Sequence, residues 1–282
     1  GIYLPEHGFP VEENPLALSQ NVAQLTVSHR FGADSGIGCL ARTVVSGKSA
    51  EGWAQFALFP DELEIREGRL KQQAELLYRK HEKYWQAVDK NDVALAFGHA
   101  ADVVVLAAWR QDAEAFNEEY CRYLQRKHRA GADTPWFAGQ IIMIARNDYT
   151  LEVFNGDIGL IMPDAESANG LAAYFPNADG FKKIAISRLP QFESAFAMTV
   201  HKSQGSEYRE VWLLPPSGKI EQGGDDALSG LNNALLYTAI TRARERFVFW
   251  GNEEQWRMAV ETRKIRRTAL GEILDTMFGS KA

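Results

Sequence analysis

The chain has 282 residues, of which 45% are hydrophobic and 24% are charged, close to the averages of globular proteins. No run approaches the roughly 18 apolar residues of a membrane span, so we expect no membrane association and a cytoplasmic protein. A net charge of −6 excludes a surface that is basic all over, so any nucleic-acid binding must be argued from local sites. Cys39 and Cys121 are too few for a disulfide framework and lack zinc-ligand spacing, which indicates a reducing compartment and no metal site.

The first half of the chain predicts helices around one buried strand. Residues 60–90 start with Pro-Asp and carry charges at i,i+4 spacing, which predicts a helical segment whose charged face is solvated. Residues 102–110, "DVVVLAAWR", form an apolar run of strand length, and a helical pattern follows from Gln111. A strand followed by a helix indicates an α/β layer with a buried parallel sheet.

The predicted secondary structure changes twice in the second half of the chain. Short β-rich segments divided by Asn-Gly, Asp-Gly and Pro indicate a small β insertion over residues 135–194. The short apolar strands then resume with "AFAMTV", "EVWLLPP" and "RFVFWG", and a helix is expected over 231–245. We therefore divide the α/β layer into a first part, 1–134, and a second part, 195–282, separated by the insertion.

A polar run, Thr199 to Ser206, follows one of these strands. Loops after the strands of an open α/β sheet commonly bind ligands, and Thr, Ser, Gln and Lys side chains with one glycine suit phosphate groups. A polar surface turn is the alternative interpretation, and His201 alone is compatible with a purely structural role.

Arg242 is the second notable feature. In a helix over 231–245 it would lie at the edge of the arc shared by Leu235, Ala239 and Ile240, whereas Arg244 would lie on the opposite side. A partly buried guanidinium requires a partner. That partner is either a carboxylate within the domain or an anion held across a cleft.

Together, "TVHKSQGSEY" and "LLYTAITRARE" resemble motifs V and VI of superfamily 1 helicases, in the form found in the RecD-like, 5′-to-3′ branch. "LTVSHRFGADSGIGCLARTVVSG" (25–47) is similar to the motif IV region of that branch. "MIARNDYTLEVFNGDIG" resembles the segment that enters its small SH3-like insertion, and the tail "ETRKIRRTALGEIL" resembles the end of the family's chains. The resemblance implies an α/β fold: a second RecA-like domain of the P-loop NTPase type, without its own P-loop and with an SH3-like β insertion.

The resemblance also implies roles for individual residues. Arg242 matches the motif VI arginine finger and Arg30 the motif IV arginine, both catalytic and ATP-binding, because such fingers neutralise charge in phosphoryl transfer. Gly205 and Glu207 match the nucleotide side of motif V. The residues that match its DNA-binding loop are Thr199, His201, Lys202, Ser203 and Gln204.

An ATP site needs parts that this sequence does not show. The triplet Gly47-Lys48-Ser49 imitates a P-loop, but Arg42 stands where GxxxxGK[ST] requires glycine, and the preceding residues predict a helix. The resemblance therefore implies the C-terminal half of a helicase subunit. ATP and Mg²⁺ would be held together with a missing N-terminal RecA-like domain, and this part alone would be inactive.

The family resemblance further implies single-stranded DNA and RecB- and RecC-like subunits as partners, with a role in exodeoxyribonuclease V, DNA repair and recombination. Two other classes remain open: a non-catalytic module for nucleic-acid or protein interaction, and a P-loop kinase or GTPase built on Lys48.

Overall fold

The computed structural model describes residues 31–32, 34–131, 134–167, 169–217 and 230–263. Apart from residues 31–32, these residues belong to one compact unit, Ala33–Lys264. The predicted site residue Arg30 and the similarity at 264–274 lie outside the described residues. Within the described part, no helix is long and apolar enough to cross a membrane.

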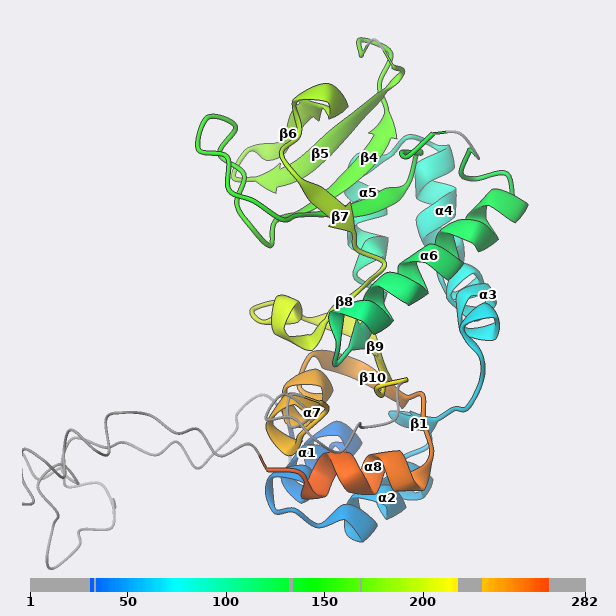
Figure 1. Ribbon diagram of the computed structural model, residues 1–282, viewed down its shortest axis with the longest axis vertical. Helices are drawn as coiled ribbons and strands as arrows, with labels where there is room; N and C mark the ends of the chain where they lie inside the picture. Colours follow the sequence, from blue (N-terminus) through cyan, green and yellow to red (C-terminus); the bar gives the residue numbers. More distant parts are fainter. Residues whose placement is uncertain (1–30, 33, 132–133, 168, 218–229, 264–282) are drawn as a thin grey trace, which may run out of the picture. The chain divides into compact units, whose positions relative to one another are not determined.

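A five-stranded parallel sheet organises the unit (Figure 1). Its strands, in spatial order, are β1 (Leu63–Ile65), β10 (Ala243–Phe249), β9 (Tyr208–Leu214), β2 (Val103–Ala107) and β8 (Ala197–Thr199). Every residue of β2 is buried, as are the last five residues of β9, which fits the expectation for a sheet covered on both faces. The predicted α/β fold with a buried parallel sheet is confirmed.

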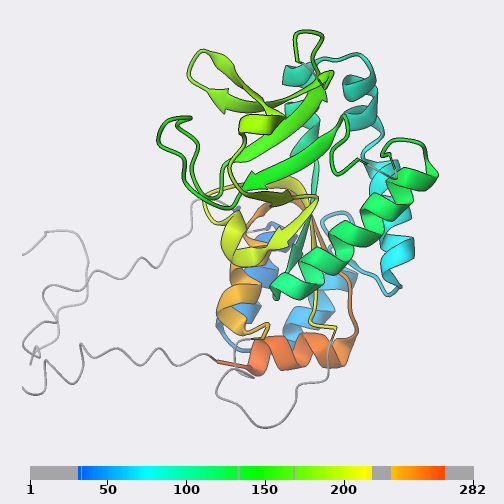
Figure 2. The same cartoon turned by 45° about the horizontal axis from the view of Figure 1, so that its top comes forward.

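Helices cover both faces of this sheet. The described helices are α1 (Gly36–Val45), α2 (Ser49–Leu58), α3 (Leu70–Lys80), α4 (Glu82–Asp89), α5 (Val93–Ala100), α6 (Arg110–Arg126), α7 (Asn233–Ile240) and α8 (Glu253–Glu261). Helix α6 packs on β2 and β8 and against α3, whereas α7 packs on β9 and β10 and against α1 and α8. In Figures 1 and 2, α6 and the group of α1, α2, α7 and α8 are seen on different sides of the strands.

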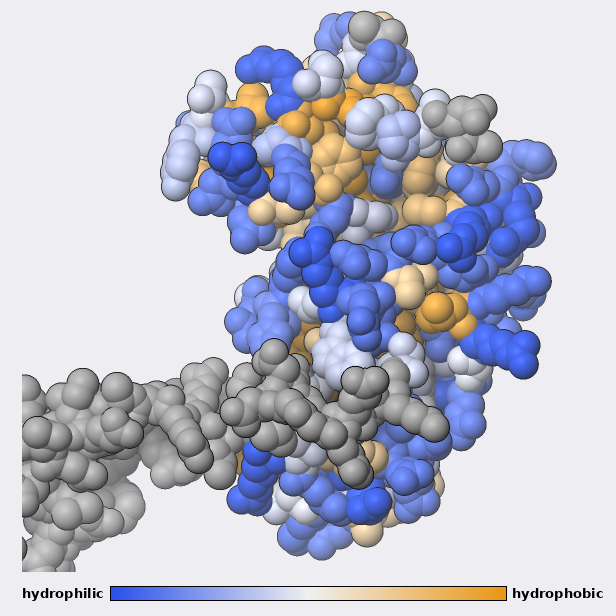
Figure 3. Space-filling view, viewed as in Figure 1, coloured by the Kyte–Doolittle hydropathy of each residue, from blue (hydrophilic) through white to orange (hydrophobic). Residues whose placement is uncertain are grey.

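The segment between β2 and β8 carries a second, antiparallel sheet. It consists of β3 (Gln140–Ile144), β4 (Ile158–Pro163), β5 (Leu171–Asn177), β6 (Gly180–Ala185) and β7 (Phe192–Ser194), in the spatial order β6-β5-β4-β3-β7. A short 3₁₀ helix, Ile186–Arg188, joins β6 to β7. The hydrophobic core of the antiparallel sheet contains Ile142, Leu151, Ile161, Phe175 and Ile184. Hydrophobic side chains show over this sheet in the face drawn in Figure 3, while the surface along α6 is mostly hydrophilic.

The turn signals of this sheet have the expected local roles. Asn177 pairs with Gly180 across the hairpin of β5 and β6, and Gly180 has φ +125. Gly156, in the "NGD" stretch before β4, has φ +98. Both glycines adopt backbone conformations that residues with a β-carbon rarely adopt. An SH3-like topology for this sheet stays a prediction.

The helical prediction for 60–90 is wrong at its start. Leu63–Ile65 is strand β1, which pairs in parallel with Phe247–Phe249 of β10. Gly68 interrupts the chain before α3, so the helical part begins at Leu70. Local charge spacing carried the prediction, but pairing with a strand more than 180 residues away overrides it.

Candidate functional site

The polar run begins at the carboxyl end of β8 and folds as a 3₁₀ turn. Thr199 is the last residue of β8 and lies opposite Ala107, the last residue of β2. Its hydroxyl oxygen accepts a hydrogen bond from the backbone N–H of Lys202 at 3.4 Å and so caps the 3₁₀ helix η3 (Val200–Ser203). Thr199 therefore shapes the run before any contact with a ligand is considered.

The next side chains point in different directions. Ser203 is fully buried, and its hydroxyl donates to the carbonyl of Val200 at 2.7 Å, which leaves it no exposed surface for a DNA strand in this conformation. Lys202 forms an ion pair with Glu193 of β7, which ties the run to the antiparallel sheet. His201 and Gln204 are exposed. Of the five predicted DNA-binding residues, these two are the most accessible.

The run ends at the amino end of β9, not at the carboxyl edge where it began. Gly205 has φ +88, and no atom lies within 4 Å of the position a β-carbon would take. The glycine is thus required by the backbone conformation, which turns the chain, and not by lack of space. Ser206 and the exposed Glu207 follow, and Tyr208 starts β9 beside Ala243 of β10. The polar run therefore connects the carboxyl end of β8 with the amino end of β9.

Arg242 joins the end of the polar run to the end of α7. Its Nη1 donates to the backbone carbonyl of Ser206 at 3.1 Å, and its Nε donates to the carbonyl of Thr238 at 3.3 Å. Its own carbonyl accepts from the N–H of Tyr208 at 2.9 Å. Burial raises the pKa of Tyr208, while Ser206 and the Arg242 guanidinium act in the opposite direction.

The predicted helix over 231–245 is too long. Helix α7 ends at Ile240, and Arg242 lies in the turn before β10, since Ala243 already pairs with Tyr208. Arg242 is only half-buried, and no carboxylate within ion-pair distance of it occurs among the described residues. The carboxylate partner considered from sequence is therefore not found in the described part of the chain. Arg244 is exposed, but it lies in strand β10 and not on the opposite side of a helix.

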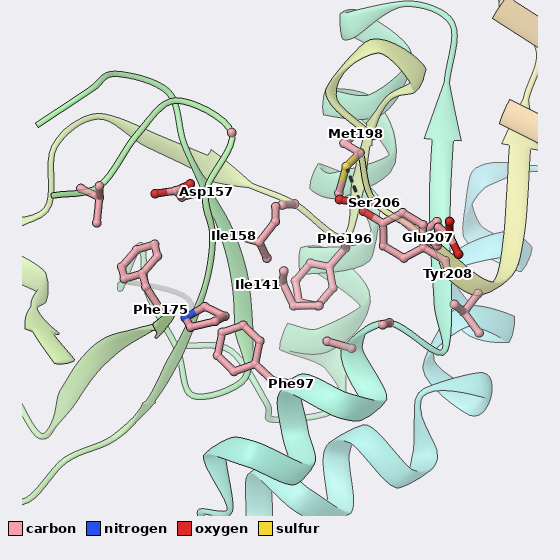
Figure 4. A pocket seen from close by; sticks show the side chains of 18 of the residues that line it. Phe97, Ile141, Asp157, Ile158, Phe175, Phe196, Met198, Ser206, Glu207 and Tyr208 are labelled. Atoms are coloured by element: carbon pink, nitrogen blue, oxygen red, sulfur yellow. Dashed lines mark hydrogen bonds between the residues drawn. The ribbon is translucent and has the colours of Figure 1, made fainter. Parts of the chain in front are cut away.

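A cavity of about 750 Å³ opens beside this junction (Figure 4). Ser206, Glu207 and Tyr208 line one side, and Asp157, Ile158 and Phe175 of the antiparallel sheet line the other, with Phe97 of α5 between them. The hydroxyl of Tyr208 donates to the sulfur of Met198 at 3.7 Å. Sequence reasoning missed this cavity because its walls come from segments more than 100 residues apart, and no local pattern signals their contact.

The apparent P-loop triplet is a helix junction. Gly47, with φ +71, follows α1, and Lys48 is the N-cap of α2. The Lys48 ammonium pairs with Glu51 at 2.9 Å. A helix precedes the triplet, as the sequence indicated, whereas a P-loop follows a strand. Among the residues that the structure describes, no cluster of three or more His, Cys, Asp or Glu side chains could hold a metal ion.

Comparison with known proteins identifies the kind of protein. The family model of the UvrD-like helicase C-terminal domain matches residues 194–249, which include the whole polar run and Arg242. The fold and this match define a superfamily 1 helicase region. The chain is 32% identical over 288 residues to the RecBCD enzyme subunit RecD of Mycobacterium tuberculosis H37Rv, with 93% of this chain and 44% of that protein covered. It is 27% identical over 282 residues to RecD of Haemophilus influenzae, with 91% and 41% covered.

These similarities identify the chain as a RecD-like helicase region that is similar to the C-terminal part of RecD. The chain spans less than half the length of these RecD subunits. Among solved structures, a Pif1 helicase from Bacteroides in complex with ADP-AlF3 and single-stranded DNA is similar, with 13% identity, a TM-score of 0.41, and 88% of this chain and 55% of that chain covered.

Proposed function

We propose that this chain is the C-terminal motor half of an ATP-dependent 5′-to-3′ DNA helicase subunit of the exodeoxyribonuclease V type. Its partners would be single-stranded DNA, RecB- and RecC-like subunits and an N-terminal RecA-like domain, and its process double-strand-break repair and recombination. The proposal is supported by the similarity to RecD over nine tenths of the chain and by the match of a helicase domain to residues 194–249.

The observation that carries the proposal is the state of Arg242. A guanidinium has five N–H donors. Two of the Arg242 donors hold carbonyls of Ser206 and Thr238, and the described residues supply no carboxylate to neutralise its charge. The half-buried cation is therefore positioned by neutral groups and remains able to bind an anion. A phosphate fits this requirement, because guanidinium groups bind phosphate oxygens through parallel hydrogen bonds.

In the proposed mechanism, Arg242 stabilises negative charge on the transferring γ-phosphoryl group, with Arg30 as the second cation and Gly205 and Glu207 on the nucleotide side. ATP supplies the phosphoryl group, and Mg²⁺ would be held mainly by the N-terminal half. Because Arg242 also holds the carbonyl of Ser206, a displacement of its guanidinium moves the end of the polar run. Thr199, His201, Lys202, Ser203 and Gln204 would relay that displacement to the DNA strand.

ATPase assays on the 282-residue chain, alone and joined to the N-terminal half of a RecD subunit, test the proposal. We expect no turnover by the chain alone and DNA-stimulated turnover by the joined protein. A Lys48→Ala variant is the control, because the Lys48 ammonium pairs with Glu51 on the surface. Turnover by the chain alone that Lys48→Ala abolishes would support a P-loop enzyme instead. A joined protein that binds DNA but never hydrolyses ATP would support a non-catalytic interaction module.

A further inference from the structure

The ion pair between Lys202 and Glu193 joins the polar run to the last strand of the antiparallel sheet. The Lys202 ammonium lies against Oε1 of Glu193. Oε2 of the same carboxylate lies 3.6 Å from Nη2 of Arg110, the first residue of α6. Arg110 in turn donates through Nε to Glu114 at 2.7 Å. Four charges of alternating sign therefore connect the polar run, β7 and α6.

The carboxylate in this series is anchored through its backbone. Glu193 belongs to β7, and Asn117 of α6 holds the residues that follow it. Nδ2 of Asn117 donates to the carbonyls of Ser194 and Ala197 at 2.9 and 2.8 Å. Oδ1 of Asn117 accepts from the N–H of Ala197 at 2.8 Å. These three hydrogen bonds tie the end of β7 and the start of β8 to one helix.

The connection between β7 and β8 is also packed. Ala195 and Phe196 are 3% and 2% exposed. The Phe196 ring meets the ring of Tyr120 in α6 edge to face, with centroids 4.7 Å apart. Movement of β7 relative to β8 would break the Asn117 hydrogen bonds and expose this ring. Glu193 therefore keeps its position when the polar run changes conformation.

The ammonium, by contrast, is able to change its partner. The side chains of Lys202 and Glu193 are 30% and 29% exposed, so solutes reach the ion pair. Ion pairs with this exposure are weak, because water screens them and both side chains lose rotamer freedom. The backbone N–H of Lys202 meets the hydroxyl of Thr199 at 3.4 Å, which is long for a hydrogen bond. An anion from solution can therefore replace Glu193 at the ammonium.

Arg110 lowers the cost of that exchange. A partly buried carboxylate that loses its cation is destabilised unless another cation takes its place. The Arg110 side chain is 70% exposed and already lies 3.6 Å from Glu193, and its attraction to the carboxylate grows as the distance shortens. Release of Lys202 therefore leaves no uncompensated charge on β7.

The surroundings of Lys202 indicate which anion takes over. His201 and Gln204, two exposed side chains of the polar run, lie on either side of it in the sequence. Lysine binds phosphate as a point charge. Contacts to backbone phosphates dominate single-strand sites that do not read sequence. The Glu193 carboxylate thus occupies the place at the ammonium that a phosphodiester would take.

We propose that Glu193 is a positioning residue that holds the Lys202 ammonium and yields it to a phosphodiester of single-stranded DNA. On binding, Lys202 exchanges the carboxylate for the phosphate, and Glu193 stays paired with Arg110. The exchange releases the polar run from the antiparallel sheet, so that binding of the strand and release of the run are one event. The inference rests on the proposed function, because it requires a single strand at the polar run.

Fluorescence anisotropy of a labelled oligothymidylate with the 282-residue chain tests the proposal. Glu193→Gln keeps the size of the side chain and removes its charge, so the strand no longer competes with a carboxylate for Lys202. We expect the affinity to rise about threefold, as for the loss of a surface ion pair. Glu114→Gln is the matched control and should change the affinity far less. It removes the same charge and a contact with Arg110, but its carboxylate does not pair with Lys202.

A double-mutant cycle separates the ion pair from a general effect of charge. Lys202→Met keeps the stem of the side chain and removes the ammonium. In this background, Glu193→Gln should no longer raise the affinity, because the pair that it breaks is already lost. Repulsion between Glu193 and the DNA through space, or altered packing of β7, would still change the affinity in this background. Melting temperatures of the variants establish that each chain is folded.

Each outcome decides for or against the proposal. A gain in Glu193→Gln that Glu114→Gln does not share, and that Lys202→Met abolishes, supports it. An equal gain in both glutamine variants, or a gain that persists without Lys202, would overturn it.

ATP in place of the oligonucleotide forms a second arm. A gain in affinity for ATP with none for the strand would assign Lys202 to a nucleotide phosphate and contradict the proposal. If the wild-type chain binds no oligothymidylate at low salt, the helicase proposal fails together with this inference. Binding by the wild-type chain that Glu193→Gln leaves unchanged removes this inference alone.

Discussion

Nη1 of Arg242 donates to the backbone carbonyl of Ser206 at 3.1 Å, although 36 positions separate the two residues. The contact links the turn after α7 with the last residues of the polar run. A side chain that holds a carbonyl of the run, and also faces no carboxylate in the described part of the chain, can transmit the presence of an anion to that run. This relationship underlies the first two predictions below.

Replacement of Arg242 by Ala in the joined protein should lower kcat far more than it raises KM for ATP. The guanidinium would stabilise charge that develops in the transition state, and arginine fingers are worth about 10³ to 10⁵ in rate. The variant Arg242→Lys should retain little of this activity, because an ammonium cannot donate to Ser206, Thr238 and a phosphate in the geometry of a planar fork. Steady-state ATPase kinetics provide the measurement.

Arg244→Ala is the matched control, since Arg244 is two residues away and exposed. It should leave kcat within about twofold. If Arg242 had a purely structural role, Arg242→Ala would instead lower the melting temperature and leave kcat of the folded fraction unchanged.

His201→Asn in the joined protein should reduce the stimulation of ATPase activity by single-stranded DNA more than it reduces basal activity. His201 is exposed and lies within the turn capped by Thr199, so its loss removes a DNA contact without removing the packing of the run. His128→Asn, at another exposed histidine, should change neither rate. Equal loss of basal and stimulated activity in His201→Asn would argue against a role in coupling.

The 282-residue chain alone should bind single-stranded DNA weakly and with a steep dependence on salt. Backbone phosphate contacts dominate sequence-independent sites of this kind, and each contact releases counterions. Fluorescence anisotropy with oligonucleotides of unrelated sequence, over a range of salt concentrations, measures both properties. A strong, sequence-specific affinity that salt does not change would favour an interaction module.

The stability of the fold should fall between pH 6.5 and 4 because of His81. Burial lowers the pKa of His81 to about 4, despite the carbonyl of Val103, which accepts from its ring at 3.2 Å. Above pH 6.5 the imidazole is neutral in both folded and unfolded chains. As the pH falls, the unfolded chain takes up a proton that the folded chain does not bind. This lowers the free energy of unfolding by on the order of 3 kcal/mol by pH 4.

The comparison of His81→Gln with the wild-type chain isolates this effect from the titration of carboxylates. The difference in free energy of unfolding between the two proteins, measured by urea titration at several pH values, should shrink as the pH falls from 6.5 to 4. A difference that is constant over this range would show that His81 is protonated in the folded chain.

The sequence by itself determined the features that depend on neighbouring residues. The apolar runs of β2, β9 and β10 predicted buried strands, because a parallel sheet leaves no polar face. The turn at Gly180 and the helix before Gly47 follow from local glycine and helix-forming patterns. The resemblance of two short motifs to superfamily 1 helicases selected Arg242 and the polar run, since motifs retain the order and spacing of reactive groups.

Only the tertiary structure decided how these pieces meet. Strand β1 exists because β10 pairs with it, and charge spacing at 60–90 contains no record of that partner. The local sequence likewise contains no record of the end of α7 at Ile240. Arg242 lies in a turn and not in that helix because β10 starts at Ala243. The burial of Ser203 and the ion pair of Lys202 with Glu193 likewise depend on packing. Hydrogen bonds and burial between distant segments are properties of the folded chain, so the cavity beside Tyr208 has no signature in any local stretch of sequence.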